Sequence, residues 1–294
     1  MRHLFILSLL AFSLQAATGF ISAEALNNML TQKDLVIVDV GSLSDYDEGH
    51  IPNAVRSEIS AWRRPVALHQ LMRSEKDIEK EMQRLGIDKG SQVVIYGHNK
   101  KKEALKSSYI ALAMIVNGLK DVAILNGAFG EWEDEDEREI STTLTKTVQG
   151  NFKAHYAPGT VVDMAYTRKH IGKVPMLEAR PPVFYYGTLR SSGVKHIGHI
   201  PQAMSSFWKD KFEIDGTLKD EATLNEIFIL GYNIKPDQEI LLYCTGGLEA
   251  SMNWFILSQH MGFTHAKIYD GSLREWANRD DTPLVRYKWE TFGY

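Results

Sequence analysis

The sequence predicts an α/β protein built from two tandem domains, each a parallel sheet flanked by helices. Three blocks occur twice in the same order, which indicates duplication of a whole domain. Gly49-His-Ile-Pro-Asn-Ala54 recurs 149 residues later, Val93-Val-Ile-Tyr96 recurs 147 residues later, and Gly127-Ala-Phe-Gly-Glu-Trp132 recurs 144 residues later. In each copy, short apolar runs alternate with helical spacing, which is typical of parallel sheets.

The same elements are expected in the same order in both copies. Each copy begins with a strand, followed by the Gly-His-Ile-Pro turn, helical segments, a central strand, a helix and a last strand. The expected strands are 35–40, a run ending at Tyr96 and 122–125 in the first copy, and 174–177, a run ending at Tyr243 and 266–269 in the second. The expected helices are 77–85, about 103–116 and about 250–261.

The chain divides into four parts. Residues 1–19 have a positive start, an uncharged and mostly apolar stretch over 4–14, and small residues near the end, which predicts a cleaved signal peptide and a periplasmic or secreted protein. The apolar stretch is too short to span a bilayer, so no membrane attachment is expected after cleavage; a buried N-terminal helix is the alternative. The two domains are predicted at 20–140 and 161–294, joined by a polar, Thr-rich linker at 141–160.

Composition excludes several classes of function. The 294 residues are 44% hydrophobic and carry a net charge of −4, which gives no support to nucleic-acid binding. A single cysteine excludes an intramolecular disulfide. The histidines show no clustered ligand spacing, so neither a metal nor a cofactor is expected. We expect a monomer.

The one cysteine, Cys244, follows an apolar strand and precedes two glycines and a helix. Backbone N–H groups of such a loop and the positive end of the helix favour a thiolate and can hold an anion. Gly246 and Gly247 let the backbone turn these groups inward. The sequence therefore predicts a nucleophilic cysteine whose pKa lies below the free value of ~8.5.

Together these blocks resemble the tandem-rhodanese sulfurtransferases over essentially the whole mature chain. The Gly-His-Ile-Pro turns match the family, as does Tyr269-Asp-Gly-Ser-Leu-Arg-Glu-Trp276. The resemblance implies that Cys244 carries sulfur as a persulfide. A small anionic donor would supply that sulfur, and a thiol, cyanide or a protein would accept it.

The first copy departs from the family pattern. Gly97 stands where the second copy has Cys244, and Asp39-Val-Gly41 replaces Glu178-Ala-Arg180. The N-terminal domain is therefore expected to be catalytically silent and to form a wall of the site.

The resemblance also suggests substrate-binding residues around Cys244. Arg180 matches the family's anion-binding arginine, although an ion pair with Glu178 is the structural alternative. The further candidates are Arg190 and Lys195 before the second Gly-His-Ile-Pro turn, and His69, which resembles a residue that the N-terminal domain turns toward the site. The loop residues Thr245, Gly246, Gly247, Leu248 and Glu249 complete the predicted set.

The loop's own side chains bear on the donor. Small neutral residues at Thr245 and Gly246 resemble the 3-mercaptopyruvate type of the family more than the thiosulfate type, which has cations there. Glu249 is unexpected at its position. If its carboxylate points inward, it raises the pKa of the cysteine and repels dianionic thiosulfate.

Other classes of function remain as alternatives. A non-catalytic or slow sulfur-carrier module for a protein partner would use the same persulfide. Cysteine phosphatases and arsenate reductases need an arginine after five intervening residues, where this chain has Ala250. Thiol-disulfide exchange lacks a second cysteine.

Overall fold

The computed structural model describes residues 18–99, 102–134 and 138–292, with the Lys102 side chain left out. The predicted signal segment therefore lies outside the described residues, apart from its last two positions. Within the described part, two five-stranded sheets and one two-stranded sheet make up the β structure. The N-terminal sheet has the order β1-β7-β6-β2-β3 and the C-terminal sheet has the order β10-β9-β11-β12-β8, and every neighbouring pair in both is parallel. The predicted fold class is confirmed.

The elements of the N-terminal domain are β1 (Gly19–Ile21), α1 (Ala23–Met29), β2 (Leu35–Asp39), α2 (Leu43–Glu48), β3 (Val55–Arg56), β4 (Arg63–Val66), β5 (His69–Met72), α3 (Glu75–Arg84), β6 (Gln92–Tyr96), α4 (Lys102–Val116), β7 (Val122–Leu125) and α5 (Ala128–Glu133). A 3₁₀ turn, η1 (Ile59–Ala61), precedes β4.

The elements of the C-terminal domain are β8 (Val161–Val162), α6 (Met164–His170), β9 (Met176–Glu178), α7 (Pro182–Tyr186), β10 (Ala203–Ser205), α8 (Glu221–Asn225), β11 (Ile240–Tyr243), α9 (Leu248–Phe255), β12 (Ala266–Tyr269) and α10 (Ser272–Trp276). A 3₁₀ turn, η2 (Trp208–Lys211), follows β10, and π-helical turns η3 (Glu226–Gly231) and η4 (Ile256–His260) extend α8 and α9.

The duplication extends to the topology of the two sheets. Each strand of the first sheet has a counterpart at the same place in the second: β1 matches β8, β7 matches β12, β6 matches β11, β2 matches β9, and β3 matches β10. The central strands β6 and β11 are buried along their whole length, as expected of parallel strands covered on both faces. Their carboxyl ends lead into the two loops that the sequence paired, at Gly97 and Cys244.

Helix α9 differs slightly from the expected 250–261. It begins at Leu248, directly after Gly247, and η4 continues it to His260. The early start places the positive end of the helix beside Cys244. Helix α3 runs from Glu75 because Ser74 caps it, with its hydroxyl accepting the N–H of Asp77.

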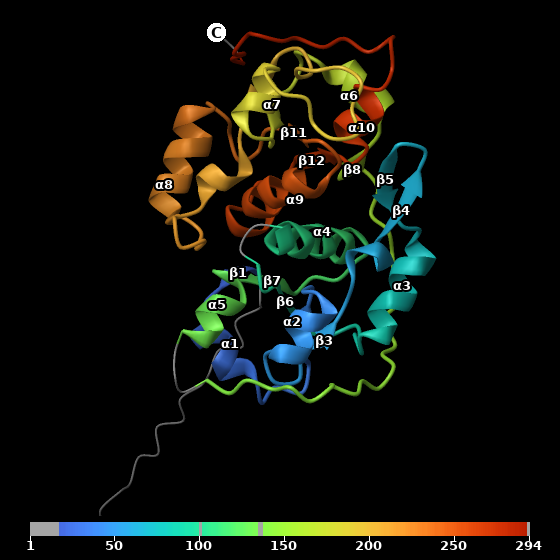
Figure 1. Cartoon of the computed structure of the whole chain (residues 1–294), viewed down its shortest axis with the longest axis vertical. Helices are drawn as coiled ribbons and strands as arrows, with labels where there is room; N and C mark the ends of the chain where they lie inside the picture. The colour runs from blue at the N-terminus through green and yellow to red at the C-terminus, as the bar shows by residue number, and fades with distance from the viewer. Residues whose placement is uncertain (1–17, 100–101, 135–137, 293–294) are drawn as a thin grey trace, which may run out of the picture.

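The two domains pack together through α4 and α9, which lie back to back at the centre of the molecule (Figure 1). The hydroxyls of Ser108 on α4 and Ser251 on α9 lie 2.9 Å apart, and small side chains such as these let the helices approach closely. One hydrophobic cluster contains residues of both domains, whereas the outer face of each sheet has a cluster of its own. The shared core fixes the N-terminal domain against the Cys244 loop of the C-terminal domain.

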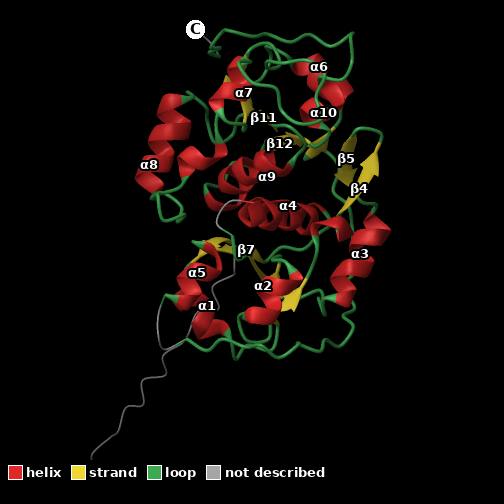
Figure 2. Ribbon diagram, viewed as in Figure 1, coloured by secondary structure: helices red, strands yellow, loops and turns green. Residues whose placement is uncertain are grey.

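Two segments lie outside the two five-stranded sheets: the β4–β5 hairpin and the connection between the domains. The antiparallel hairpin β4–β5 projects from the N-terminal domain toward the C-terminal one (Figure 2). Residues 142–160 connect the domains and contain no helix or strand. None of the helices in the described parts of the chain has the length and apolarity needed to span a membrane.

Candidate active site

Cys244 lies at the carboxyl end of β11, where its side chain is fully enclosed. Its Sγ accepts the backbone N–H of Gly247 at 3.1 Å, and its own N–H donates to the Ser272 hydroxyl at 3.2 Å. Gly247 has φ +92°, and a Cβ there would lie 2.5 Å from an oxygen of Asp270. Only glycine fits this position, so the predicted role of Gly247 in shaping the loop agrees with the geometry.

The protonation of Cys244 differs from the expectation. The N–H groups of Gly246, Gly247 and Ala250 act on the thiol and lower its pKa, as the sequence predicts. Burial and the charge of Glu249 outweigh them and raise the pKa of Cys244 to about 12. The expectation of a depressed pKa is therefore wrong for the enclosed site, because desolvation of the thiolate is the larger effect.

Glu249 points into the site. Its carboxylate interacts with the thiol of Cys244 and with the backbone N–H of Thr245. Burial and the nearby Glu178 raise the pKa of Glu249 to about 7, although the charge of Arg180 opposes the shift. The inward orientation, which the sequence left open, places a proton-binding carboxylate against the nucleophile.

Arg180 has partners on all three guanidinium nitrogens. Its Nε donates to Glu178, Nη1 donates to the Ser191 hydroxyl at 3.1 Å, and Nη2 donates to the carbonyl of Gly198 at 2.7 Å. Burial lowers the pKa of Arg180, but the charge of Glu178 and the hydrogen bond to it raise the pKa more. These contacts match the alternative interpretation of Arg180 as a structural residue paired with Glu178. They connect the end of β9 to the Gly-His-Ile-Pro turn.

Arg190 and Lys195 lie together in a surface cavity of about 450 Å³. His196, Arg279 and Arg286 line the same cavity, and no residue of the Cys244 loop does. Lys195 forms an ion pair with Asp280. In the described part of the chain, no hydrogen bond or ion pair links either of these two predicted residues to the Cys244 loop.

The hairpin β4–β5 contacts the turn that follows β12. The backbone N–H of Met72 donates to Asp270 at 2.7 Å, and the Tyr109 hydroxyl on α4 lies 2.9 Å from both oxygens of Asp270. The charge of His69, the predicted residue at the start of β5, also acts on Asp270. The N-terminal domain thus supports Asp270, which lies directly against Gly247.

Arg63 is a residue of the site that sequence reasoning missed. It lies on β4, and its Nη2 donates to the carbonyl of Gly246 in the Cys244 loop. Its guanidinium stacks on the Tyr109 ring, 4.6 Å from the ring centre. No local motif marks Arg63, because it reaches the loop only through the packing of one domain on the other.

The equivalent loop of the N-terminal domain is filled by its own side chains. The Glu103 carboxylate accepts the N–H groups of His98 at 2.8 Å and Asn99 at 2.9 Å. The His98 ring binds Asp39 at 2.8 Å and occupies the space beside Gly41, the counterpart of Arg180. The Glu103 carboxylate therefore occupies the loop amides that an anionic substrate would need, which agrees with the predicted silence without testing it.

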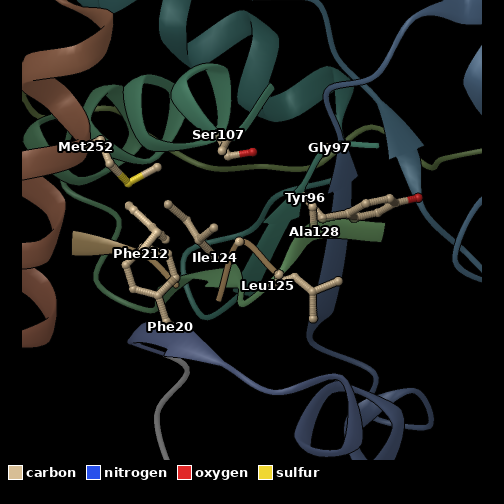
Figure 3. A pocket seen from close by; sticks show the side chains of 12 residues that line it. Phe20, Tyr96, Gly97, Ser107, Ile124, Leu125, Ala128, Phe212 and Met252 are labelled. Atoms are coloured by element: carbon tan, nitrogen blue, oxygen red, sulfur yellow. The ribbon is translucent and has the colours of Figure 1, made fainter. Parts of the chain in front are cut away.

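An apolar pocket lies beside this silent loop (Figure 3). Tyr96, Gly97 and Ser107 line one side, and Phe212 and Met252 reach it from the C-terminal domain. No charged side chain of the described residues lines it. Such a lining does not suit an anionic substrate.

Comparison with known proteins decides the family. The model of the rhodanese-like domain matches residues 22–135 and again 162–279. The chain belongs to the rhodanese family. The two matched segments correspond to the two sheets, and the resemblance seen in the sequence is confirmed.

The relatives of this rhodanese include proteins named for sulfur transfer. It is 32% identical to the sulfur carrier protein TtuD of Thermus thermophilus, with 82% of this chain and 87% of the relative covered. It is 26% identical to a thiosulfate sulfurtransferase of Corynebacterium glutamicum (90% and 89% covered) and 25% identical to the 3-mercaptopyruvate sulfurtransferase of Escherichia coli (93% and 100%). These relatives support sulfur transfer as the class of activity.

Solved structures show the same fold. The crystal structure of YnjE matches with a TM-score of 0.79 at 22% identity, covering 92% of this chain and 68% of the other. The wild-type structure of EanB matches with a TM-score of 0.76 at 23% identity, covering 93% and 69%.

Proposed function

We propose that this rhodanese moves a sulfane sulfur from a small anionic donor to a thiophilic acceptor through a persulfide on Cys244. The observation that supports it most is the position of Sγ, which accepts the Gly247 N–H at the N-terminus of α9. The chain has no other cysteine. One thiol therefore forms and discharges the persulfide.

In the first half-reaction the residues around the enclosed Cys244 move to admit the donor and water. The thiol then loses its proton to water, and the thiolate attacks the outer sulfur of the donor. A new S–S bond forms while the donor's bond to that sulfur breaks, and the electron pair leaves with the remainder of the donor. Thiosulfate would release sulfite; 3-mercaptopyruvate would release the enolate of pyruvate, which then takes a proton. This is covalent catalysis in two steps.

In the second half-reaction a thiolate or cyanide attacks the terminal sulfur of the persulfide. The S–S bond breaks and Cys244 leaves as a thiolate, so the cycle has no net oxidation or reduction of the protein. The N–H groups of Gly246, Gly247 and Ala250 that act on the thiol are placed to stabilise the persulfide anion as well.

Glu249 supports a donor other than thiosulfate. Its carboxylate faces the thiol, so a donor with two negative charges on a compact group meets repulsion there. A 3-mercaptopyruvate-like donor places its carboxylate farther from the sulfur that is attacked. We therefore propose a 3-mercaptopyruvate-like donor for this rhodanese.

A sulfur-carrier role is the second candidate. The relative of highest identity among those described above is named a sulfur carrier protein. In addition, Cys244 has no exposed surface, so its side chain becomes reachable only after a movement of the surrounding residues. A carrier would hold the persulfide until a protein partner induces that movement.

The test is intact-mass measurement after incubation with each donor, followed by addition of cyanide. We expect a mass increase of one sulfur atom in the wild type and none in Cys244→Ser, with thiocyanate released repeatedly. A sulfur adduct that survives in Cys244→Ser would contradict the persulfide on Cys244. Loading without repeated release would favour the carrier.

We further propose that residues 1–19 direct export and are then removed. The positive start and the apolar stretch over 4–14 support this proposal. The N-terminal residue of protein recovered from expressing cells tests it, since an N-terminus at Met1 in the cytoplasmic fraction would contradict export.

A further inference from the structure

Arg63 is a buried cation without a carboxylate partner. The residue is 6% exposed, and no described carboxylate forms an ion pair with it within 4.0 Å. Its Nη2 donates to the carbonyls of Gln70 and Gly246, but its Nε has no hydrogen-bond partner. One N–H of a buried guanidinium is therefore unsatisfied beside the Cys244 loop.

An unsatisfied donor on a buried guanidinium is energetically costly. Buried charges are normally paired, because removing them from water costs several kcal/mol. The Tyr109 ring offsets part of this cost through its face. The charge of Arg63 acts to lower the pKa of the buried Asp270, but burial raises that pKa more. The Met72 N–H and the Tyr109 hydroxyl bind the oxygens of Asp270.

The expected anion-binding residue, Arg180, has no guanidinium nitrogen without a hydrogen-bond partner. Arg180 donates from Nε, Nη1 and Nη2 to protein acceptors, including the carboxylate of Glu178. Arg274 on α10 also lies near Gly246, but it is partly exposed and its Nε donates to the carbonyl of Ser192 at 3.4 Å. Arg63 is thus the desolvated cation at this loop with an unsatisfied donor.

We propose that Arg63 binds the anionic group of the sulfur donor, so that the N-terminal domain supplies the substrate-binding cation of the Cys244 site. The inference rests on the proposed sulfur transfer. A carboxylate or sulfonate accepts the free Nε–H and neutralises the buried charge. Because Arg63 lies on β4, donor binding involves the same hairpin that contacts Asp270 through Met72.

The experiment compares Arg63→Gln and Arg63→Lys with two controls. Arg64→Gln removes the neighbouring exposed cation, and Arg274→Gln removes the other arginine near Gly246. The reaction of Cys244 is followed by intact mass with 3-mercaptopyruvate and thiosulfate, which leave a persulfide, and with an uncharged dialkyl trisulfide. The thiolate attacks the central sulfur of the trisulfide, so a mixed trisulfide remains on Cys244 and an alkanethiolate departs. Thermal unfolding of each variant shows that it is folded.

We expect Arg63→Gln to raise KM for the anionic donors by about tenfold to a hundredfold. This increase corresponds to the loss of one charge-assisted hydrogen bond. The uncharged donor should react at an unchanged rate, and Arg63→Lys should recover part of the affinity. An equal loss with charged and uncharged donors would overturn the proposal, because Arg63 would then only hold the hairpin in place. A loss confined to Arg274→Gln would overturn it as well.

Binding without chemistry separates this inference from the proposed function. Calorimetric titration of Cys244→Ser with thiosulfate and with 3-mercaptopyruvate measures affinity alone, and the Arg63→Gln double variant should bind at least tenfold more weakly. If the wild type forms no persulfide while this Arg63-dependent binding is present, sulfur transfer fails and the anion site stands. If both Cys244→Ser proteins bind equally, the anion site fails.

Discussion

The Glu103 carboxylate accepts the backbone N–H of His98 at 2.8 Å, and with the N–H of Asn99 it fills the N-terminal counterpart of the catalytic loop. The N-terminal domain therefore contains an anion of its own in the loop where backbone amides could otherwise bind a substrate anion. Gly97 completes this arrangement, since a Cβ there would lie 2.4 Å from the Glu103 Cβ.

Introducing a cysteine at position 97 should therefore not give the N-terminal loop the ability to take up sulfur. We expect Gly97→Cys in a Cys244→Ser background to acquire no sulfur from any donor and to lose about 1 to 3 kcal/mol of stability through the clash with Glu103. Intact-mass measurement and chemical denaturation check both effects. A sulfur adduct on the introduced thiol would show that the Glu103 carboxylate does not block the loop.

Glu249 should control the pH at which Cys244 reacts. Its negative charge raises the pKa of the thiol, so Glu249→Gln should lower that pKa and shift the pH profile of alkylation downward by about one pH unit or more. The rate of persulfide formation from thiosulfate should also rise relative to the rate from 3-mercaptopyruvate. Glu226→Gln, which alters an exposed carboxylate, is the control. An unchanged alkylation profile in Glu249→Gln would contradict the inward-facing charge.

Lys211 should make stability depend on pH. Its ammonium is buried and donates to the Ser206 hydroxyl at 2.9 Å and the Phe207 carbonyl at 2.8 Å, with the rings of Phe228 and Tyr232 nearby. Burial lowers the pKa of Lys211 to about 7, and the charge of Asp210 only partly opposes this shift.

The direction of the pH dependence follows from the charge of Lys211 in the folded and unfolded chains. Above pH 7 the unfolded chain keeps a proton on Lys211 that the folded chain has lost, so the free energy of unfolding rises with pH, by up to about 1.4 kcal/mol per pH unit. Below pH 7 both states are charged, and the cost of burying the charge is fully present. We expect Lys211→Met to be more stable than the wild type at pH 6, with the difference shrinking toward pH 9. Urea unfolding of both proteins at pH 6 and pH 9 measures this difference in stability. A difference that stays the same at both pH values would contradict the effect.

The sheets and the conformation of the Cys244 loop could be predicted because their signals lie in consecutive residues. The apolar runs of β6 and β11, the glycines after Cys244 and the repeated turns each describe a local backbone conformation. The duplication added a comparison within one chain, in which Gly97 replaces Cys244 in an otherwise equivalent place.

The partners of the charged side chains could not be predicted in the same way. Arg180 matched a family position, yet its nitrogens are taken by Glu178, Ser191 and Gly198. The pKa of Cys244 moved opposite to the expectation because burial, which a motif does not record, outweighs the loop amides.

The sequence by itself determined a two-domain α/β protein with one cysteine, at Cys244, and it predicted that this cysteine is the nucleophile and that the first loop is silent. Only the tertiary structure decided that Glu249 faces the thiol and that Arg63 reaches Gly246, a residue 183 positions away in the chain. The physical reason is the range of the interactions. Backbone conformation follows from neighbouring residues, whereas desolvation and charge pairing depend on which surfaces the packing of α4 on α9 brings together.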